Sequence, residues 1–104
     1  PEPCPNSKPS WFGFLLTCRE GVDKNKVVQY IEDHGVQTRM LFAGNIVKQP
    51  CFDEMRASGK GYRVVGNLAV TDRIMKDTFW LGVYPGMTDE KIDYMAKVIK
   101  EALQ

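Results

Sequence analysis

The clearest structural signal lies in residues 78–103, which read TFWLGVYPGMTDEKIDYMAKVIKEAL. Thr78–Tyr84 is a short aromatic and aliphatic run, which is typical of a buried strand. Pro85-Gly86 is a strong turn pair that ends this strand. Thr88 can then cap a helix, because its hydroxyl can accept a hydrogen bond from a free backbone N–H. The segment therefore predicts a strand, a turn and a helix in succession.

The final helix carries an apolar stripe. Met87 and Ile92 flank its start and can form a hydrophobic staple. Residues three and four apart lie on one face of a helix, and the apolar ones here are Ile92, Met95, Ala96, Ile99 and Leu103. The spacing predicts that this face packs on the core.

Two more strands and another helix are predicted upstream. Trp11–Cys18 and Val36–Phe42 have the length and composition of buried strands. Between them, Asp23 can cap a helix over Lys24–His34. Gly35 can end that helix, because glycine readily takes the left-handed conformation of a C-terminal cap.

Shorter helices are expected from Pro50 to Met55 or Arg56, and from Thr71 or Asp72 to Lys76. The order strand, helix, strand, short helices, strand, helix predicts an α+β fold, a small sheet of about three strands covered by helices on one face. Residues 1–10 hold four of the six prolines and are assigned to an extended linker or arm. Residues 11–104 are assigned to one compact domain, for which a radius of gyration of roughly 13 Å is expected.

Composition limits the function classes. The chain has 104 residues and a formal net charge of +1, which argues against nucleic-acid binding driven by bulk charge. The longest apolar run, Trp11–Leu16, is far shorter than the ~20 residues of a membrane-spanning helix, so no membrane partner is expected. Three cysteines without C-x-x-C spacing favour a reducing, cytoplasmic setting. Because Pro1 replaces an initiating methionine, we expect a piece of a longer protein.

Few side chains suggest chemistry. His34, the only histidine, is expected to complement carbonyls at a helix C-terminus rather than to act as a base. Cys18 and Cys51 lack an activating base and are interpreted as small buried hydrophobes. Scattered cysteines and one histidine make a metal site improbable. The strand aromatics are interpreted as core residues, namely Trp11, Phe12, Phe14, Phe79 and Trp80.

Residues 37–45, QTRMLFAGN, are unusual because Arg39 interrupts a mostly apolar strand. Its planar guanidinium could clamp a phosphate, a carboxylate or sugar hydroxyls. On spacing alone, a surface arginine on a half-exposed strand is the better interpretation. The residues by themselves assign no catalytic residue and no complete active site.

Short motifs spread over about residues 7–103 carry a family resemblance: SWFGF (10–14), DHGVQTR (33–39), LFAGN (41–45), QP (49–50) and DTFWLGVYPG (77–86). Together they resemble the C-terminal small domain of the sugar aminotransferase and dehydratase family of fold-type-I pyridoxal-phosphate enzymes. Aminotransferase members usually carry a histidine after the Thr-Arg segment, where this chain has Phe42-Ala43-Gly44-Asn45. The resemblance is therefore to the 3-dehydratase branch, which acts on CDP-4-keto-6-deoxyglucose in lipopolysaccharide biosynthesis.

The resemblance implies what the complete enzyme does. It is expected to use pyridoxal or pyridoxamine phosphate to remove the C3 hydroxyl of a nucleotide-linked 4-keto-6-deoxy sugar for lipopolysaccharide O-antigen. A 2Fe-2S cluster and a reductase partner are expected to supply electrons, and a homodimer is expected. Both cofactors belong to preceding segments, so this chain alone is expected to hold neither and to be inactive.

The resemblance also places the loop from Arg39 to Asn45 at one side of the active-site cleft. Arg39, Phe42 and Asn45 are the predicted substrate-binding residues. Two other classes stay open, a stand-alone α+β binding module and a dimer-interface module without catalysis. The second would associate in a concentration-dependent way without responding to a ligand.

Overall fold

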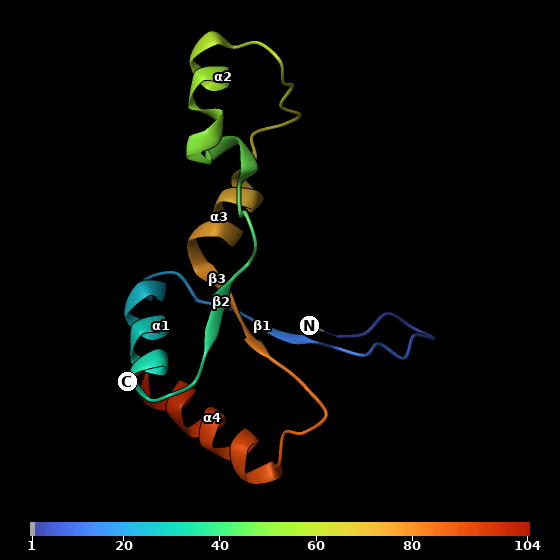
Figure 1. Cartoon of the computed structure of the whole chain (residues 1–104), viewed down its shortest axis with the longest axis vertical. Coiled ribbons are helices and arrows are strands. Elements are labelled where there is room, and N and C mark those ends of the chain that lie inside the picture. Colours follow the sequence, from blue (N-terminus) through green and yellow to red (C-terminus); the bar gives the residue numbers. More distant parts are fainter. Residues whose placement is uncertain (1) are drawn as a thin grey trace.

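The computed structural model describes residues 2–104 and confirms the α+β prediction. Its elements are β1 (Gly13–Thr17), α1 (Lys24–Asp33), β2 (Thr38–Met40), the 3₁₀ turns η1 (Ile46–Lys48) and η2 (Pro50–Phe52), α2 (Asp53–Ser58), α3 (Ala69–Asp77), β3 (Thr78–Gly82) and α4 (Asp89–Glu101). The strands form one antiparallel sheet in the order β1-β3-β2, so β3 lies in the centre. α1 and α4 lie next to the sheet, whereas α2 lies at the far end of the molecule (Figure 1).

Helix α1 begins and ends as its capping residues predict. Asp23 Oδ1 accepts a hydrogen bond from the Asn25 N–H at 2.9 Å. Gly35 takes a left-handed φ of +75°, and the Val36 N–H donates to the Ile31 carbonyl at 3.1 Å. This geometry satisfies carbonyls that the helix end would otherwise leave without partners.

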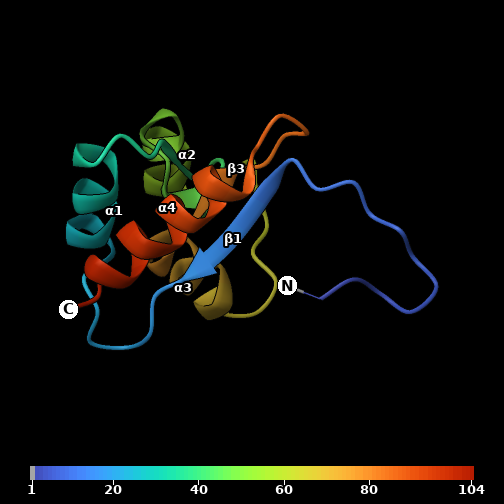
Figure 2. The ribbon, with the colours of Figure 1, turned by 90° about the horizontal axis from the view of Figure 1, so that it is seen from below.

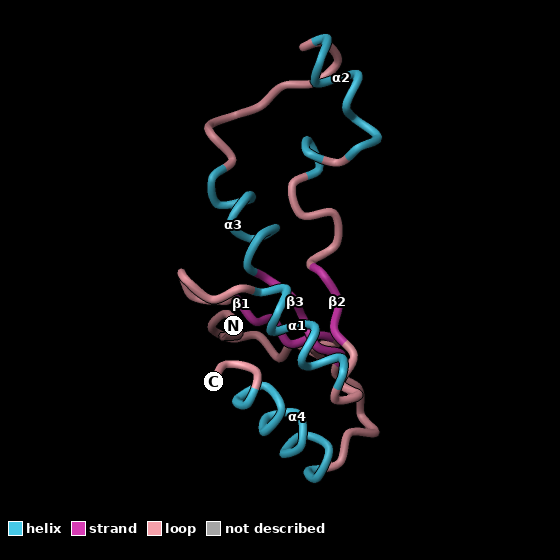
Figure 3. Tube along the Cα trace, turned by 90° about the vertical axis from the view of Figure 1, so that its left-hand side faces the viewer, coloured by secondary structure: helices cyan, strands magenta, loops and turns pink. Residues whose placement is uncertain are grey.

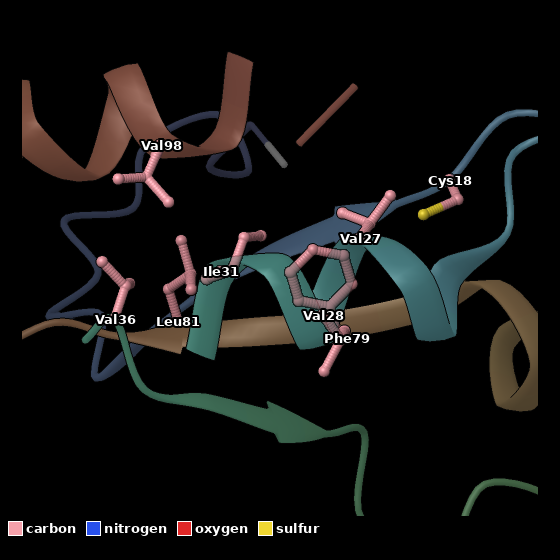
Figure 4. Close-up of a cluster of buried hydrophobic side chains, with 8 residues drawn as sticks. All are labelled: Cys18, Val27, Val28, Ile31, Val36, Phe79, Leu81 and Val98. Carbon is pink, nitrogen blue, oxygen red and sulfur yellow. The ribbon is translucent and has the colours of Figure 1, made fainter. Parts of the chain in front are cut away.

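The core lies between one face of the sheet and the two long helices (Figures 2 and 4). Its buried side chains are Cys18, Val27, Val28, Ile31, Val36, Phe79, Leu81 and Val98. Phe79 and Leu81 lie two positions apart on β3 and share its core face, where Ile31 of α1 is completely buried against them. Full burial of such side chains contributes about 1.5–3 kcal/mol each, so β3 and α1 are the centre of stability.

The predicted core face of α4 is partly wrong. Val98 is its buried residue, with Met95, Ile99 and Ala102 partly buried beside it. Ile92 and Leu103 are about half exposed, and Ala96 is also exposed. The helix is rotated so that the row 95–98–99–102 faces α1 and the sheet. Spacing alone does not distinguish this row from the neighbouring one.

The radius of gyration is 16.9 Å rather than the expected 13 Å, and the molecule measures 52 × 37 × 23 Å. Residues 43–68, the distal arm, contribute to the difference: they carry η1, η2 and α2 away from the sheet, and α3 leads back to it (Figures 1 and 3). The segment before β1 also extends away from the sheet (Figure 2). Among the described core residues, none comes from the distal arm. The chain is therefore a compact sheet–helix unit with a projection.

The strands are shorter than predicted. β2 stops at Met40 because the chain turns there, with the Phe42 N–H donating to the Met40 carbonyl at 2.7 Å. β3 ends at Gly82, followed by one more bond from the Val83 N–H to the Phe12 carbonyl. In contrast, α3 spans Ala69–Asp77 and is longer than predicted.

Candidate functional site

A row of side chains crosses the sheet on the face opposite the core. Trp80 lies between the buried residues Phe79 and Leu81, so its side chain points to the other face. The strand register pairs Trp80 with Leu15 on β1 and with Arg39 on β2. Directly paired residues of an antiparallel sheet share a face. The Arg39 position and the Trp80 ring therefore belong to one surface.

The Trp80 ring is held in place by its neighbours. A Cβ atom at Gly13 would lie 2.6 Å from the ring, so only glycine leaves it room. The indole N–H donates to the Met40 carbonyl at 3.2 Å. Phe12 packs edge-on with a centroid separation of 5.4 Å, and Phe42 lies at 6.4 Å. The three aromatic rings form a continuous apolar surface.

Phe42 is presented to solvent by an uncommon backbone conformation. Its side chain is 75% exposed and its φ is +46°, in the left-handed region that bulky residues seldom occupy. Such conformations cost about 1–3 kcal/mol and persist where the surrounding structure imposes them, often at functional sites. The loop therefore holds a large apolar ring outward.

Arg39 is exposed beside this surface. Its Nη1 donates to the Thr38 carbonyl at 2.8 Å. With its amide oxygen turned toward the guanidinium, Gln37 accepts from Nη1 and Nη2 at 3.2 and 3.0 Å. These contacts orient the guanidinium and leave further N–H donors for a ligand.

An open cleft of about 590 Å³ adjoins Arg39 and Trp80. Its other side-chain walls include Tyr84, Tyr94, Glu90 and Lys91. Lys91 Nζ donates to the Tyr84 hydroxyl at 3.1 Å, and the Tyr94 hydroxyl donates to the His34 carbonyl at 2.9 Å. Aromatic walls with a few polar groups are typical of sites for small organic ligands, and this volume is within their usual range of about 300–1,000 Å³.

Asn45 occupies a different environment. Its residue is 2% exposed, and Nδ2 donates to Asp72 Oδ1 at 2.7 Å. Its Oδ1 accepts from the Val47 N–H at 3.1 Å. Hydrogen bonds from Asn45 and then from Lys48 lower the pKa of the Asp72 carboxyl below its ordinary value. Both ends of the Asn45 amide are thus engaged within the chain.

The structure brings two of the three predicted substrate-binding residues together. Arg39 and Phe42 both border Trp80, whereas Asn45 is buried at the base of the distal arm. The interpretation of the strand aromatics as core residues holds for Phe79 and is wrong for Trp80 and for the exposed Trp11, Phe12 and Phe14. Tyr84 and Tyr94 were overlooked. Successive side chains of a strand point to opposite faces, and this is the signal that separates Trp80 from Phe79 and Leu81.

The remaining candidates have structural surroundings. His34 caps α1 and bonds to the Tyr30 carbonyl through Nδ1 at 2.7 Å, as predicted. Its ring also stacks on Tyr30. Cys18 is buried, and burial, followed by the nearby Asp77 charge, raises the pKa of its thiol. The interpretation of Cys51 as buried is wrong: it is exposed because η2 lies in the distal arm, away from the core.

Residues 2–100 match the DegT/DnrJ/EryC1/StrS aminotransferase family. The chain belongs to this family. It is 46% identical to the lipopolysaccharide biosynthesis protein RfbH of Salmonella typhimurium and 41% identical to a dTDP-4-dehydro-2,6-dideoxy-D-glucose 3-dehydratase of Saccharopolyspora spinosa. Each alignment covers 97% of the chain but only 22% and 21% of those proteins. This DegT/DnrJ/EryC1/StrS chain thus spans about a fifth of their length.

The family implies pyridoxal phosphate, but the side chains of this segment do not fit that group. Lys24 is the buried lysine of the described chain, and its Nζ donates to the Met75 carbonyl at 2.8 Å. Each other lysine within residues 2–104 is exposed, and Lys91, which borders the open cleft, donates to the Tyr84 hydroxyl. The described residues of this DegT/DnrJ/EryC1/StrS chain therefore offer no enclosed lysine site for the cofactor's aldehyde.

An iron-sulfur cluster does not fit this segment either. Cys4 lies in the N-terminal arm, Cys18 in the core and Cys51 in the distal arm. Within residues 2–104, no group of three or more His, Cys, Asp or Glu side chains is placed to hold a metal ion. No helix in that range has the length and apolar character needed to cross a membrane.

Proposed function

We propose that this chain is the C-terminal small domain of a pyridoxal- or pyridoxamine-phosphate-dependent nucleotide-sugar 3-dehydratase that makes deoxysugars for lipopolysaccharide O-antigen. Its membership of the DegT/DnrJ/EryC1/StrS family supports the cofactor class. The names of its two relatives, a lipopolysaccharide biosynthesis protein and a sugar-nucleotide 3-dehydratase, support the pathway and the reaction. The coverage of about a fifth of each relative supports the assignment as a part of the enzyme.

The surface formed by Arg39, Phe42 and Trp80 is the observation that carries the proposal. It combines an oriented guanidinium with an aromatic ring that a left-handed backbone holds in solvent. It lies on the sheet face that α1 and α4 leave uncovered. A domain that closes one side of a substrate cleft needs such a preorganised surface. We call Arg39, Phe42 and Trp80 the substrate wall.

Each wall residue suits a different part of a nucleotide-linked sugar. The Arg39 fork matches phosphate oxygens or vicinal hydroxyls through paired hydrogen bonds. The Phe42 ring offers an apolar contact of the kind that a 6-deoxy methyl group and a sugar ring face require. Within this proposal the chain binds and positions substrate, and it supplies no proton-transferring residue.

The proposal extends to the whole enzyme. A nucleotide-linked 4-keto-6-deoxy sugar is the substrate, a 2Fe-2S cluster and a reductase supply electrons, and the enzyme acts as a cytoplasmic homodimer. These features rest on the resemblance of the sequence motifs. On that resemblance, the residues that hold both cofactors lie in preceding segments of the enzyme.

Steady-state kinetics of the complete enzyme test whether Arg39 of this surface binds substrate. Arg39→Ala removes a charge-assisted hydrogen bond worth about 1.5–3 kcal/mol, so kcat/KM is expected to fall by about one to two powers of ten. Arg39→Lys keeps the charge but loses the fork, so it should recover only part of the activity. Arg63→Ala is the matched control, because Arg63 is exposed in the distal arm. Wild-type kcat/KM in Arg39→Ala would contradict the proposal.

An interface module without catalysis is the second candidate. The exposed aromatics Phe12 and Phe42, which flank Trp80, favour it, because contiguous apolar surface marks interaction sites. This function predicts association that depends on protein concentration and is unchanged by nucleotide sugars. Analytical ultracentrifugation of the chain, with and without a nucleotide-linked 4-keto-6-deoxy sugar, distinguishes the two.

A further inference from the structure

The amide of Asn45 joins two segments that are far apart in the sequence. It lies where the distal arm leaves the sheet, and its partner Asp72 lies on α3, where the chain returns. One end of the amide donates to the Asp72 carboxylate and the other accepts from the Val47 N–H. The base of the arm is thereby closed by a single buried side chain.

Asp72 is well suited to this contact. Its second oxygen accepts from Lys48 Nζ at 2.9 Å, in an ion pair that is partly exposed. The hydrogen bonds from Asn45 and Lys48 lower its pKa, so the carboxyl is ionised at neutral pH. A hydrogen bond to an ionised acceptor is stronger than one between neutral groups.

Helix α3 also packs against the loop that carries Phe42. Gly44 has a φ of +59°, and a Cβ atom there would lie 2.5 Å from Met75 Cγ. The Asn45 N–H itself points to Met75 Sδ at 3.4 Å. The left-handed turn of residues 42–44 is therefore held between the sheet and α3.

We propose that Asn45 is a positioning residue, whose bond to Asp72 holds the turn of residues 42–44 so that Phe42 stays beside Trp80. The proposal rests on the proposed function, which makes Phe42 part of the substrate wall. It explains the need for an amide: one end must donate to a carboxylate while the other accepts a backbone N–H. An aspartate at position 45 would keep the acceptor but set two carboxylates against each other.

The test exchanges the two side chains in the complete enzyme. Asn45→Asp should raise KM for the nucleotide-linked 4-keto-6-deoxy sugar, CDP- or dTDP-linked, that the wild type turns over. We expect about a tenfold to hundredfold rise, since small displacements of positioning groups have effects of that size. The swap Asn45→Asp with Asp72→Asn should restore KM to within about threefold, because the new amide can donate to the new carboxylate.

A matched control and a second readout keep the test specific. Asn67→Asp adds the same charge in the same arm and keeps the oxygen that accepts from the Ala69 N–H, so its KM should be unchanged. Hydrogen exchange of the residue 42–45 amides should accelerate in Asn45→Asp and return to the wild-type rate in the swap. If Asn45→Asp does not fold, Asp72→Asn alone, which replaces the carboxylate with a neutral amide, should show a smaller rise in KM.

Different failures separate this proposal from the proposed function. If Arg39→Ala and Phe42→Ala leave KM unchanged, the substrate wall is wrong, and hydrogen exchange alone still decides whether Asn45 holds the turn. If those variants raise KM but Asn45→Asp does not, the positioning role is wrong. A swap that recovers the melting temperature without recovering KM or the exchange rates would also overturn it, because Asn45 would then serve stability alone.

Discussion

The sheet–helix unit and the distal arm are held together by different forces. In the sheet–helix unit, β3 and α1 bury Phe79, Leu81 and Ile31 almost completely. In the arm, Asn45 is the fully buried residue among those described between 43 and 68, and it is polar. Arg56 bonds to the Val47 and Gln49 carbonyls and so ties α2 to the start of the arm.

The difference shows how stability and site geometry can be separated in one small chain. Apolar burial is non-directional and sets the free energy of unfolding of the sheet–helix unit. Hydrogen bonds at the arm's base are directional, and they fix the conformation of a loop that buries little surface. Regions with few buried apolar contacts open more readily than the core. The proposed substrate wall lies at the boundary between the sheet–helix unit and the distal arm.

The largest expected effect is in the core. Phe79→Ala should lower the free energy of unfolding by about 3–5 kcal/mol, because Phe79 is 2% exposed at the centre of the sheet. Phe42→Ala removes the same atoms from an exposed ring and should change stability by no more than about 0.5 kcal/mol. Urea denaturation of both variants measures the contrast. Similar midpoints would show that the core is not where the stability resides.

Substitutions of two glycines compare the base of the distal arm with its tip. Gly44→Ala combines a left-handed φ with a clash against Met75 and should cost about 2–4 kcal/mol. Gly59, which ends α2, has a φ of +66° but open space around it, so Gly59→Ala should cost only about 1–2 kcal/mol. Thermal melts compare the two. Equal losses would mean that α3 does not press on the loop.

The smallest expected effect is a pH dependence from Asp72. Because its pKa is lowered in the folded chain, ionised Asp72 stabilises the fold above the ordinary carboxyl range, and this contribution disappears as pH falls through the lowered pKa. The melting temperature of the wild type should therefore approach that of Asp72→Asn on acidification from pH 6 toward pH 3. Melts of both proteins across this range measure the difference. A difference in melting temperature between the two proteins that grows toward low pH would contradict this prediction.

Local signals predicted the helices of the sheet–helix unit well. Asp23, Gly35 and Thr88 occupy the caps expected from their residue types. Cap chemistry depends on neighbours within four residues, so it can be inferred without the tertiary structure. The same holds for His34 at the end of α1.

Signals that depend on distant neighbours were less informative. Asn45 was predicted to face substrate, yet its partner Asp72 is 27 residues away and becomes visible only when α3 folds back. Substrate contact by Asn45 stays a prediction, and the geometry favours the positioning role. Trp80 and Phe79 are adjacent and both aromatic, so alternation puts them on opposite faces of β3. The packing of α1 and α4 decides which of the two faces is the core.

The sequence by itself determined the element order, the helix caps and the α+β class, because these follow from periodicity and from contacts between near neighbours. The tertiary structure alone decided which face of α4 is buried, where the distal arm projects and which residues share a surface. The reason is physical: an apolar stripe or a polar side chain has several possible partners, and only the packed chain selects one. Arg39, Phe42 and Trp80 become a wall only through that selection.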